Sequence, residues 1–170
     1  SIKFYKDKSF RVKKIEISKK KEQTLNNRLL LLYTGNRRRA HDVAQSYVSD
    51  LTNKNIDIMF KLQEFTHLAK KYLVKGSLDD FGDLLNESWH LKKRLGAKIS
   101  SSFIDEIYDK AIECGSLGGK ILGAGGGGFF LFYIHENKIN EFKKKFSQFE
   151  IIQFKFEKEG SKIIFNNEHI

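Results

Sequence analysis

A run of glycines between two apolar segments is the feature of this sequence that most restricts its fold. Residues 120–133 read Lys-Ile-Leu-Gly-Ala-Gly-Gly-Gly-Gly-Phe-Phe-Leu-Phe-Tyr. Glycine has no side chain to pack in a strand and loses much backbone entropy when ordered, so glycines between two strand-like runs need a reason. Two reasons remain open: a hairpin that requires positive φ, or backbone N–H groups that lie bare against an anion.

The number of glycines favours the second reason, because a hairpin alone needs only one or two. We therefore predict a loop that binds phosphate through its backbone. The candidate residues are Gly123, Ala124, Gly125, Gly126, Gly127 and Gly128. Lys120 lies shortly before the loop, so its side chain either contacts the same phosphate or is an ordinary surface side chain of a strand. The nearby glycines favour the first interpretation.

Neither common phosphate-binding loop fits this pattern. A P-loop has Lys-Ser/Thr directly after its last glycine, followed by a helix. A dinucleotide-binding loop also opens a helix. Here the glycines are followed by residues 129–133, which form an apolar run typical of a strand.

Composition narrows the classes of partner. The net charge of +10 indicates an anionic partner: nucleic acid, a membrane surface or phosphorylated small molecules. No apolar run approaches the length of a membrane span. The single cysteine, Cys114, fits a reducing cytoplasmic location and reads as a small buried side chain. The histidines show no metal-ligand spacing, so we predict no metal site.

The order of apolar patterns predicts an α+β fold. Residues 2–6 and 10–17 alternate like a hairpin, residues 18–27 read as a polar linker, and residues 29–33 read as a buried central strand. The remaining segments are helices at 40–51, 59–76, 77–95, 102–112 and 139–146, and strands near 118–123, 128–134, 152–156 and 162–165. This order predicts a ferredoxin-like βαββαβ plan with several helices in the first crossover, plus an N-terminal β-hairpin.

Three consecutive arginines, Arg37, Arg38 and Arg39, fall at the predicted start of the first crossover helix. Cations there oppose the helix dipole, and a bound anion would remove the conflict, because guanidinium groups and helix N-termini both favour phosphate. A solvated cluster before a helix that starts later is the other interpretation. Both stay open.

Residues 120–128 resemble the third motif of the GHMP kinases, Lys-x-x-Gly-Ala-Gly-x-Gly-Gly. Residues 29–36, 86–92 and 104–120 are similar to the sugar-phosphate branch of that family, which contains the bacterial heptose 7-phosphate kinases. The resemblance covers about residues 27–156. It implies a role in an ATP-dependent sugar-phosphate kinase, with the glycine loop beside the phosphates.

The resemblance also implies two lobes. The N-terminal lobe of the family carries a nucleotide loop, Pro-x-x-x-Gly-Leu-Gly-Ser-Ser-Ala, and in most branches a catalytic aspartate. This chain contains no proline, so we expect only the C-terminal lobe over residues 27–170, with residues 1–26 left from a missing N-terminal lobe. The catalytic aspartate is then expected upstream of Ser1, and the isolated chain is expected to be inactive. ATP and Mg²⁺ are the implied cofactors of the full-length enzyme.

A stand-alone ferredoxin-like module that binds a small anion or RNA is the alternative function. RNA-binding sheets of this plan carry aromatic residues within a recognisable Arg/Lys-Gly-Phe/Tyr motif. That motif is absent from the sequence, which argues against a nucleic-acid partner.

Overall fold

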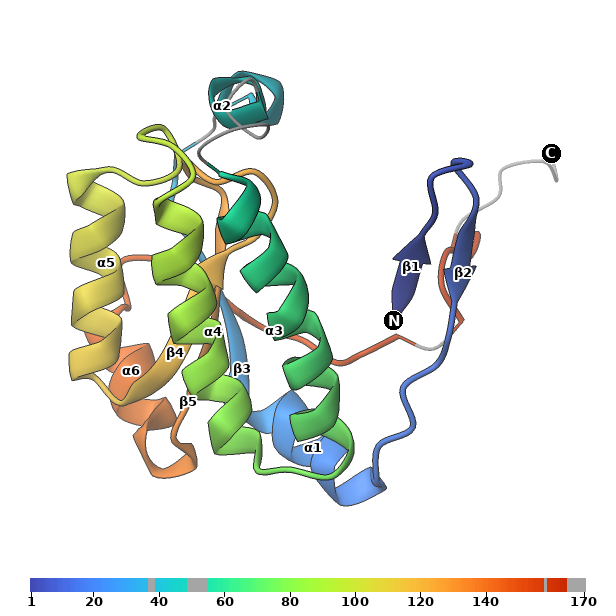
Figure 1. Ribbon diagram of the computed structural model, residues 1–170. Helices are drawn as coiled ribbons and strands as arrows, with labels where there is room; N and C mark the ends of the chain where they lie inside the picture. The colour runs from blue at the N-terminus through green and yellow to red at the C-terminus, as the bar shows by residue number, and fades with distance from the viewer. Residues whose placement is uncertain (37–38, 49–54, 158, 165–170) are drawn as a thin grey trace, which may run out of the picture.

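The computed structural model describes residues 1–36, 39–48, 55–157 and 159–164. Its main sheet has four antiparallel strands in the order β4-β5-β3-β6 (Figure 1). Their bounds are β3 Leu29–Tyr33, β4 Ser116–Ile121, β5 Phe129–Ile134 and β6 Glu150–Gln153. Strand β3, the first along the chain, lies between β6, the fourth, and β5, the third. Strand β5 in turn pairs with β4, the second. This arrangement is the ferredoxin-like plan that the sequence predicted, within the α+β class.

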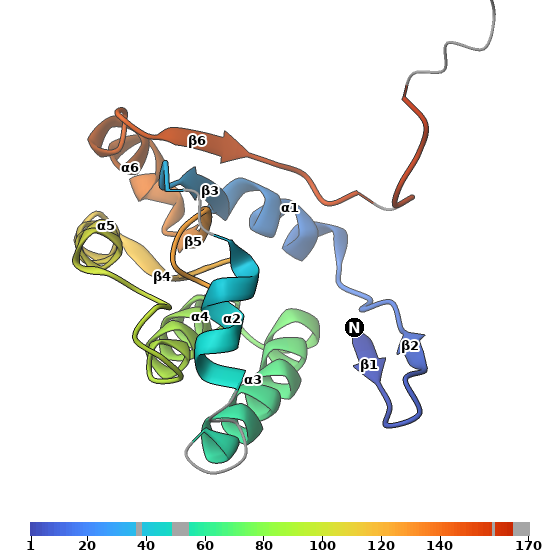
Figure 2. The ribbon, with the colours of Figure 1, turned by 90° about the horizontal axis from the view of Figure 1, so that it is seen from above.

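The two crossovers differ greatly in size. The first contains α2 (Ala40–Val48), α3 (Ile56–Val74), α4 (Leu78–Lys93) and α5 (Ser102–Glu113). The second contains the 3₁₀ turn η1 (Glu136–Lys138) and α6 (Ile139–Lys145). Helix α4 packs along β4 at the sheet edge, and α3 packs on α4 (Figures 1 and 2). No helix in the described ranges is long and apolar enough to cross a membrane.

Residues 19–28 form helix α1 (Lys19–Arg28), so the prediction of a linker over residues 18–27 is wrong. The helix has a single large apolar side chain, Leu25, and therefore shows no helical period in the sequence. Contacts with distant parts of the chain stabilise helix α1, rather than an apolar face of its own. The Lys21 Nζ atom donates to the carbonyl oxygens of Tyr72, Leu73 and Gly76 at 3.0, 3.1 and 2.7 Å. The division of the chain at residue 26 itself stays a prediction.

The N-terminal hairpin is confirmed but is shorter than predicted. Strand β1 (Ile2–Phe4) pairs antiparallel with β2 (Phe10–Val12) in a separate two-stranded sheet. Every residue of both strands is exposed, and the hairpin stands apart from the main sheet (Figure 1).

The strands predicted at the C-terminal end also differ. Strand β6 begins at Glu150 and ends at Gln153, earlier than the predicted 152–156. Residues 162–164 are not a strand, contrary to the prediction for 162–165, and Phe165 lies outside the described residues. The alternating apolar pattern there has no neighbouring strand to pair with in the described chain.

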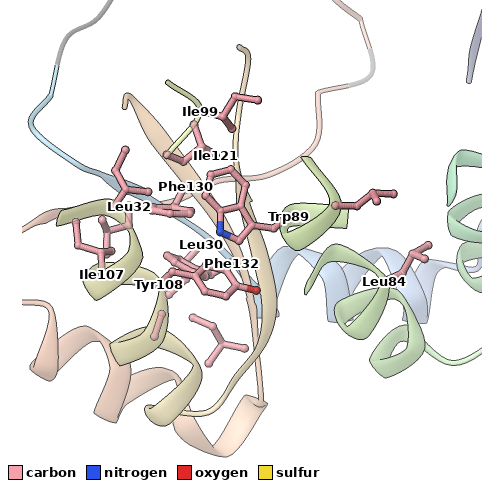
Figure 3. Close-up of a cluster of buried hydrophobic side chains, with 14 of the residues drawn as sticks. Leu30, Leu32, Leu84, Trp89, Ile99, Ile107, Tyr108, Ile121, Phe130 and Phe132 are labelled. Carbon is pink, nitrogen blue, oxygen red and sulfur yellow. The ribbon is translucent and has the colours of Figure 1, made fainter. Parts of the chain in front are cut away.

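Side chains on the two faces of the sheet belong to two separate core clusters. On one face, Trp89 of α4 lies against Phe130 with ring centroids 5.6 Å apart, and Tyr108 of α5 lies 6.0 Å from Phe132 (Figure 3). Trp89 is fully buried, as expected of a core residue, and Cys114 is a buried free thiol. On the other face, Tyr133 packs with Leu25 and Leu29, which are both buried.

Candidate functional site

The glycine loop connects the end of β4 to the start of β5 at the edge of the sheet. Five of its glycines have positive φ, which side-chain-bearing residues rarely adopt. These are Gly123, Gly125, Gly126, Gly127 and Gly128, with φ between 74° and 149°. The loop conformation alone therefore requires more glycines than a two-residue hairpin does.

Two of these glycines are also closely covered by the protein itself. A Cβ added at Gly127 would lie 2.7 Å from the carbonyl oxygen of Asn36, and one at Gly125 would lie 3.0 Å from that of Ile99. Hydrogen bonds join the same segments. Gly126 N donates to Ile99 O at 2.8 Å, and Gly128 N donates to Asn36 O at 3.0 Å. Residues 125 and 127 are therefore glycine partly because Ile99 and Asn36 pack closely against them. The sequence did not indicate this packing.

The other side of the loop is open. Nothing lies within 4 Å of a Cβ added at Gly123 or Gly128. Within the described residues, the N–H groups of Gly123, Ala124, Gly125 and Gly127 have no hydrogen-bond acceptor. Successive bare N–H groups in a turn form a concavity that suits an anion. The loop therefore retains the donors that a phosphate would need.

Two lysines lie beside the start of the loop. Lys92, at the end of α4, donates from Nζ to the carbonyl oxygens of Gly123 at 2.6 Å and Ile121 at 3.3 Å. Lys120, on β4, donates from Nζ to Ser88 Oγ at 3.3 Å. Ser88 and Lys92 are four residues apart, so they share one face of α4. In the described chain neither ammonium group forms an ion pair.

The surroundings of these lysines destabilise their charged forms. Burial, with a smaller contribution from the positive charge of Lys120, lowers the pKa of Lys92 to about 8. Burial also lowers the pKa of Lys120. Lys120 was a predicted site residue, whereas Lys92 was missed. Two features of the sequence could have pointed to Lys92. It ends the segment 86–92 that resembles the sugar-phosphate kinases, and it lies four residues after Ser88, on the same face of a helix.

Both lysines line a groove of about 460 Å³ between α3, α4 and β4. Its walls are mainly apolar, with Leu62 and Phe65 from α3 and Leu84 and Leu85 from α4. Gly123 lies at the same end as the two lysines. The groove therefore joins an apolar surface to a cationic end beside the glycine loop.

The predicted arginine cluster is only partly described. Arg37 and Arg38 lie outside the described residues, and Arg39 is exposed directly before α2. The segment that leads to the cluster is fixed to the loop, because Thr34 N and Oγ1 both donate to Gly128 O, at 2.9 and 3.0 Å. The chain at the end of β3 thus runs beside the glycine loop.

The site has N–H groups that can donate hydrogen bonds to a phosphate group and ammonium groups whose positive charge would attract it. Its bare N–H groups and two ammonium groups fit the phosphates of a nucleotide or of a sugar phosphate. No cluster of three His, Cys, Asp or Glu side chains suited to a metal ion occurs among the residues with described positions.

These features define a ferredoxin-like α+β domain with a glycine loop at its sheet edge. Residues 69–151 match the family model of the GHMP kinases C terminal. The chain therefore contains a GHMP kinase C-terminal domain, which confirms the resemblance seen in its sequence.

The known proteins that resemble this chain include several kinases. The chain is 28% identical over 166 residues to the D-glycero-alpha-D-manno-heptose 7-phosphate kinase of Campylobacter jejuni, a match that covers 95% of this chain and 48% of that enzyme. A putative sugar kinase structure from Campylobacter jejuni superposes with a TM-score of 0.68 at 26% identity, over 94% of this chain and 45% of that one. The structure of the Methanococcus jannaschii mevalonate kinase superposes with a TM-score of 0.65 at 27% identity, over 87% of this chain and 44% of that one. The chain spans about half the length of these relatives.

Proposed function

We propose that this chain is the C-terminal lobe of an ATP-dependent sugar-phosphate kinase and that its glycine loop binds a phosphate group in the active site. The observation that carries the proposal is the set of four loop N–H groups, those of Gly123, Ala124, Gly125 and Gly127, that have no acceptor among the described residues. The 28% identity to a heptose 7-phosphate kinase over nearly the whole chain supports a heptose phosphate as substrate.

Each part of the site has a role in this proposal. The N–H groups of Gly123, Ala124, Gly125 and Gly127 hold phosphate oxygens, and Gly126 and Gly128 fix the loop to its neighbours. Phosphoryl transfer depends almost wholly on positioning and on stabilising charge, so preorganised donors are what such a loop contributes. The ammonium group of Lys120 adds positive charge nearby. ATP would supply the phosphoryl group, and Mg²⁺ would neutralise part of the charge on its phosphates.

The substrate's own phosphate is assigned, in the same proposal, to the arginine cluster of Arg37, Arg38 and Arg39. The cluster follows Asn36, whose carbonyl accepts from Gly128 N. The cluster therefore follows, within three residues of sequence, a residue that is hydrogen-bonded to the loop. Charge-assisted hydrogen bonds from arginine to phosphate are among the strongest in proteins.

The remaining parts of the active site belong to an N-terminal lobe. We propose that this lobe carries the nucleotide loop and the catalytic aspartate, and that the hairpin of residues 1–17 is associated with it. The exposed apolar side chains of the hairpin, which include Phe4 and Phe10 at 75% and 63% exposure, support this association.

An NMR titration of the chain tests the phosphate role of the loop. Mg-ATP and heptose 7-phosphate are added separately, and the amide signals of Gly123, Ala124, Gly125 and Gly127 are followed. We expect these signals to shift, while that of Gly160, an open glycine far along the chain, stays in place. If neither ligand moves the loop signals, the loop does not bind phosphate and the proposal is wrong.

One observation favours the alternative of a nucleic-acid-binding module. Tyr33 and Phe129 lie on the two central strands with ring centroids 5.0 Å apart, half-buried and outside both core clusters. Paired aromatic rings on central strands stack on bases in RNA-binding sheets. Binding of a short single-stranded RNA that is lost in Phe129→Ala, with no response to Mg-ATP, would establish this function instead.

A further inference from the structure

We infer that Lys92 and Lys120 together form a binding site for the phosphate group of a phosphorylated ligand, at the cationic end of the groove between α3 and α4. This inference deepens the proposed function and rests on it for the identity of the ligand. It assigns a second phosphate position beside the glycine loop.

The first argument is the way the two ammonium groups are bonded. Among the described residues, Lys92 is held by the carbonyls of Ile121 and Gly123 alone, and Lys120 by the hydroxyl of Ser88 alone, at 3.3 Å. An ammonium group has three N–H donors, so Lys120 uses one of them weakly and keeps donors for a ligand.

Two other lysines show how this chain pairs such groups elsewhere. Lys93, the next residue on α4, forms an ion pair with Asp105 at 2.9 Å. Lys21 makes three bonds of 3.1 Å or less to carbonyls at the C-terminal end of α3, where the helix dipole favours a cation. Among the described residues neither Lys92 nor Lys120 pairs with a carboxylate. Lys92 lies in the last turn of α4, but its ammonium group bonds carbonyls of β4 and the loop rather than of a helix end.

The second argument is electrostatic. Two like charges that share a partly desolvated groove raise each other's free energy, and an anion between them removes both penalties. Burial lowers the pKa of both lysines, and the positive charge of Lys120 adds to the shift of Lys92. Among the described residues, the other titratable side chain that lines the groove is Tyr47 of α2, and no carboxylate lines it. A dianionic phosphate is the kind of group that would complete the site.

The third argument is position. Lys92 bonds the Gly123 carbonyl, so the lysine pair adjoins the open side of the loop. A kinase that phosphorylates a sugar phosphate must hold the phosphate on the sugar as well as the three phosphates of ATP. Besides the proposed arginine cluster, the loop N–H groups and the lysine pair give two neighbouring positions for these groups.

Binding of inorganic phosphate to the chain tests the inference. The wild type is compared with Lys92→Met, Lys120→Met and Lys92→Arg by calorimetry and by NMR of the lysine side-chain signals. Lys61→Met is the control, because Lys61 is an exposed lysine on α3 and its removal changes the net charge equally. We expect each site methionine to weaken binding about ten- to a hundredfold, and Lys61→Met to leave it within about twofold. Lys92→Arg should retain most of the affinity.

Proton uptake gives a second measurement that a structural role would not produce. Because the pKa of free Lys92 is about 8, phosphate binding near pH 8 should take up part of a proton, which calorimetry in buffers of different ionisation enthalpy detects. Phosphate itself exchanges a proton in this pH range, so the wild type is compared with Lys92→Met at each pH. The wild type should take up more protons than Lys92→Met near pH 8, and the difference should shrink at about pH 6, where Lys92 is already charged.

The outcomes separate this inference from the proposed function. Equal phosphate affinity in wild type, Lys92→Met and Lys120→Met overturns the inference, as does an equal loss in Lys61→Met. Competition with heptose 7-phosphate and with a non-hydrolysable ATP analogue then shows which phosphate occupies the pair. Failure of the proposed function appears in the loop amides instead, where neither Mg-ATP nor heptose 7-phosphate produces a shift.

Discussion

At the scale of single residues, the glycines of the loop divide into two kinds. Gly125 and Gly127 face protein atoms, whereas Gly123 and Gly128 face open space. The excess of glycine therefore has two causes that the sequence does not separate: close packing within the lobe and an open side for a ligand. Substitutions at the two kinds of position should have different consequences.

Replacing Gly127 by valine should destabilise the fold as well as any ligand binding. The new Cβ would meet the Asn36 carbonyl at 2.7 Å, and overpacking of this kind costs about 1–3 kcal/mol. Thermal and urea unfolding of Gly127→Val measure the loss. An unchanged free energy of unfolding with impaired binding of Mg-ATP would mean that Gly127 serves the ligand alone.

Replacing Gly123 by alanine should weaken phosphate binding more than its matched control. Gly160 has almost the same φ, 72° against 74°, and both positions are open. Alanine should therefore cost each about 1–2 kcal/mol of conformational free energy. Only Gly123→Ala places a methyl group beside the bare N–H groups of the loop. Titration of both variants with Mg-ATP checks this, and equal affinities would contradict it.

The lowered pKa of Lys92 predicts how stability depends on pH. In the unfolded chain this lysine keeps its proton up to the ordinary value of 10.5, whereas in the fold it loses the proton near pH 8. The unfolded state therefore binds more protons between these values, and this group adds stability as the pH rises through that window. Below pH 8 its destabilising effect is fully present. The difference in melting temperature between wild type and Lys92→Met should increase in favour of the wild type from pH 8 to pH 10; a constant difference would contradict the shift.

At the scale of elements, α1 and the hairpin next to it behave in opposite ways. Helix α1 contributes Leu25 to the core and fixes the C-terminal end of α3 through Lys21. The hairpin exposes all of its strand residues. The lobe should thus depend on the first element and not on the second.

Leu25→Ala should lower the free energy of unfolding by about 2–5 kcal/mol, as for other buried leucines. Deletion of residues 1–14 should leave the unfolding midpoint nearly unchanged, because those residues are exposed. Urea unfolding of both proteins gives the comparison. A large loss of stability on deletion would show that the hairpin packs on the lobe.

At the scale of the whole molecule, the chain spans about half the length of the kinases that it resembles. The match to the heptose kinase covers 48% of that enzyme. We expect no phosphoryl transfer by this chain alone, because positioning and charge stabilisation require several parts of an active site at once. A coupled assay of ADP release with heptose 7-phosphate and Mg-ATP tests this. Turnover above the buffer control by protein free of contaminating kinase would refute it.

Several features of this protein were determined by local sequence. The continuous apolar run of β3 required pairing on both sides, and the apolar runs around the glycines required a hairpin. Ser77 is the N-cap of α4, at the predicted start of that helix, and Trp89 on the apolar side of the helix is in the core. Each of these depends on periodicity or on a short-range hydrogen bond, so neighbouring residues suffice to predict it.

Other features were decided only by the tertiary structure. Helix α1 forms from a polar segment because distant carbonyls accept from Lys21 and the core accepts Leu25. Gly127 must be glycine partly because the end of β3 runs beside the loop. Lys92 and Lys120 come from different elements and meet only because α4 packs along β4. Contacts between residues far apart in the chain leave no periodic signal, so the positively charged end of the groove had to be found in the fold.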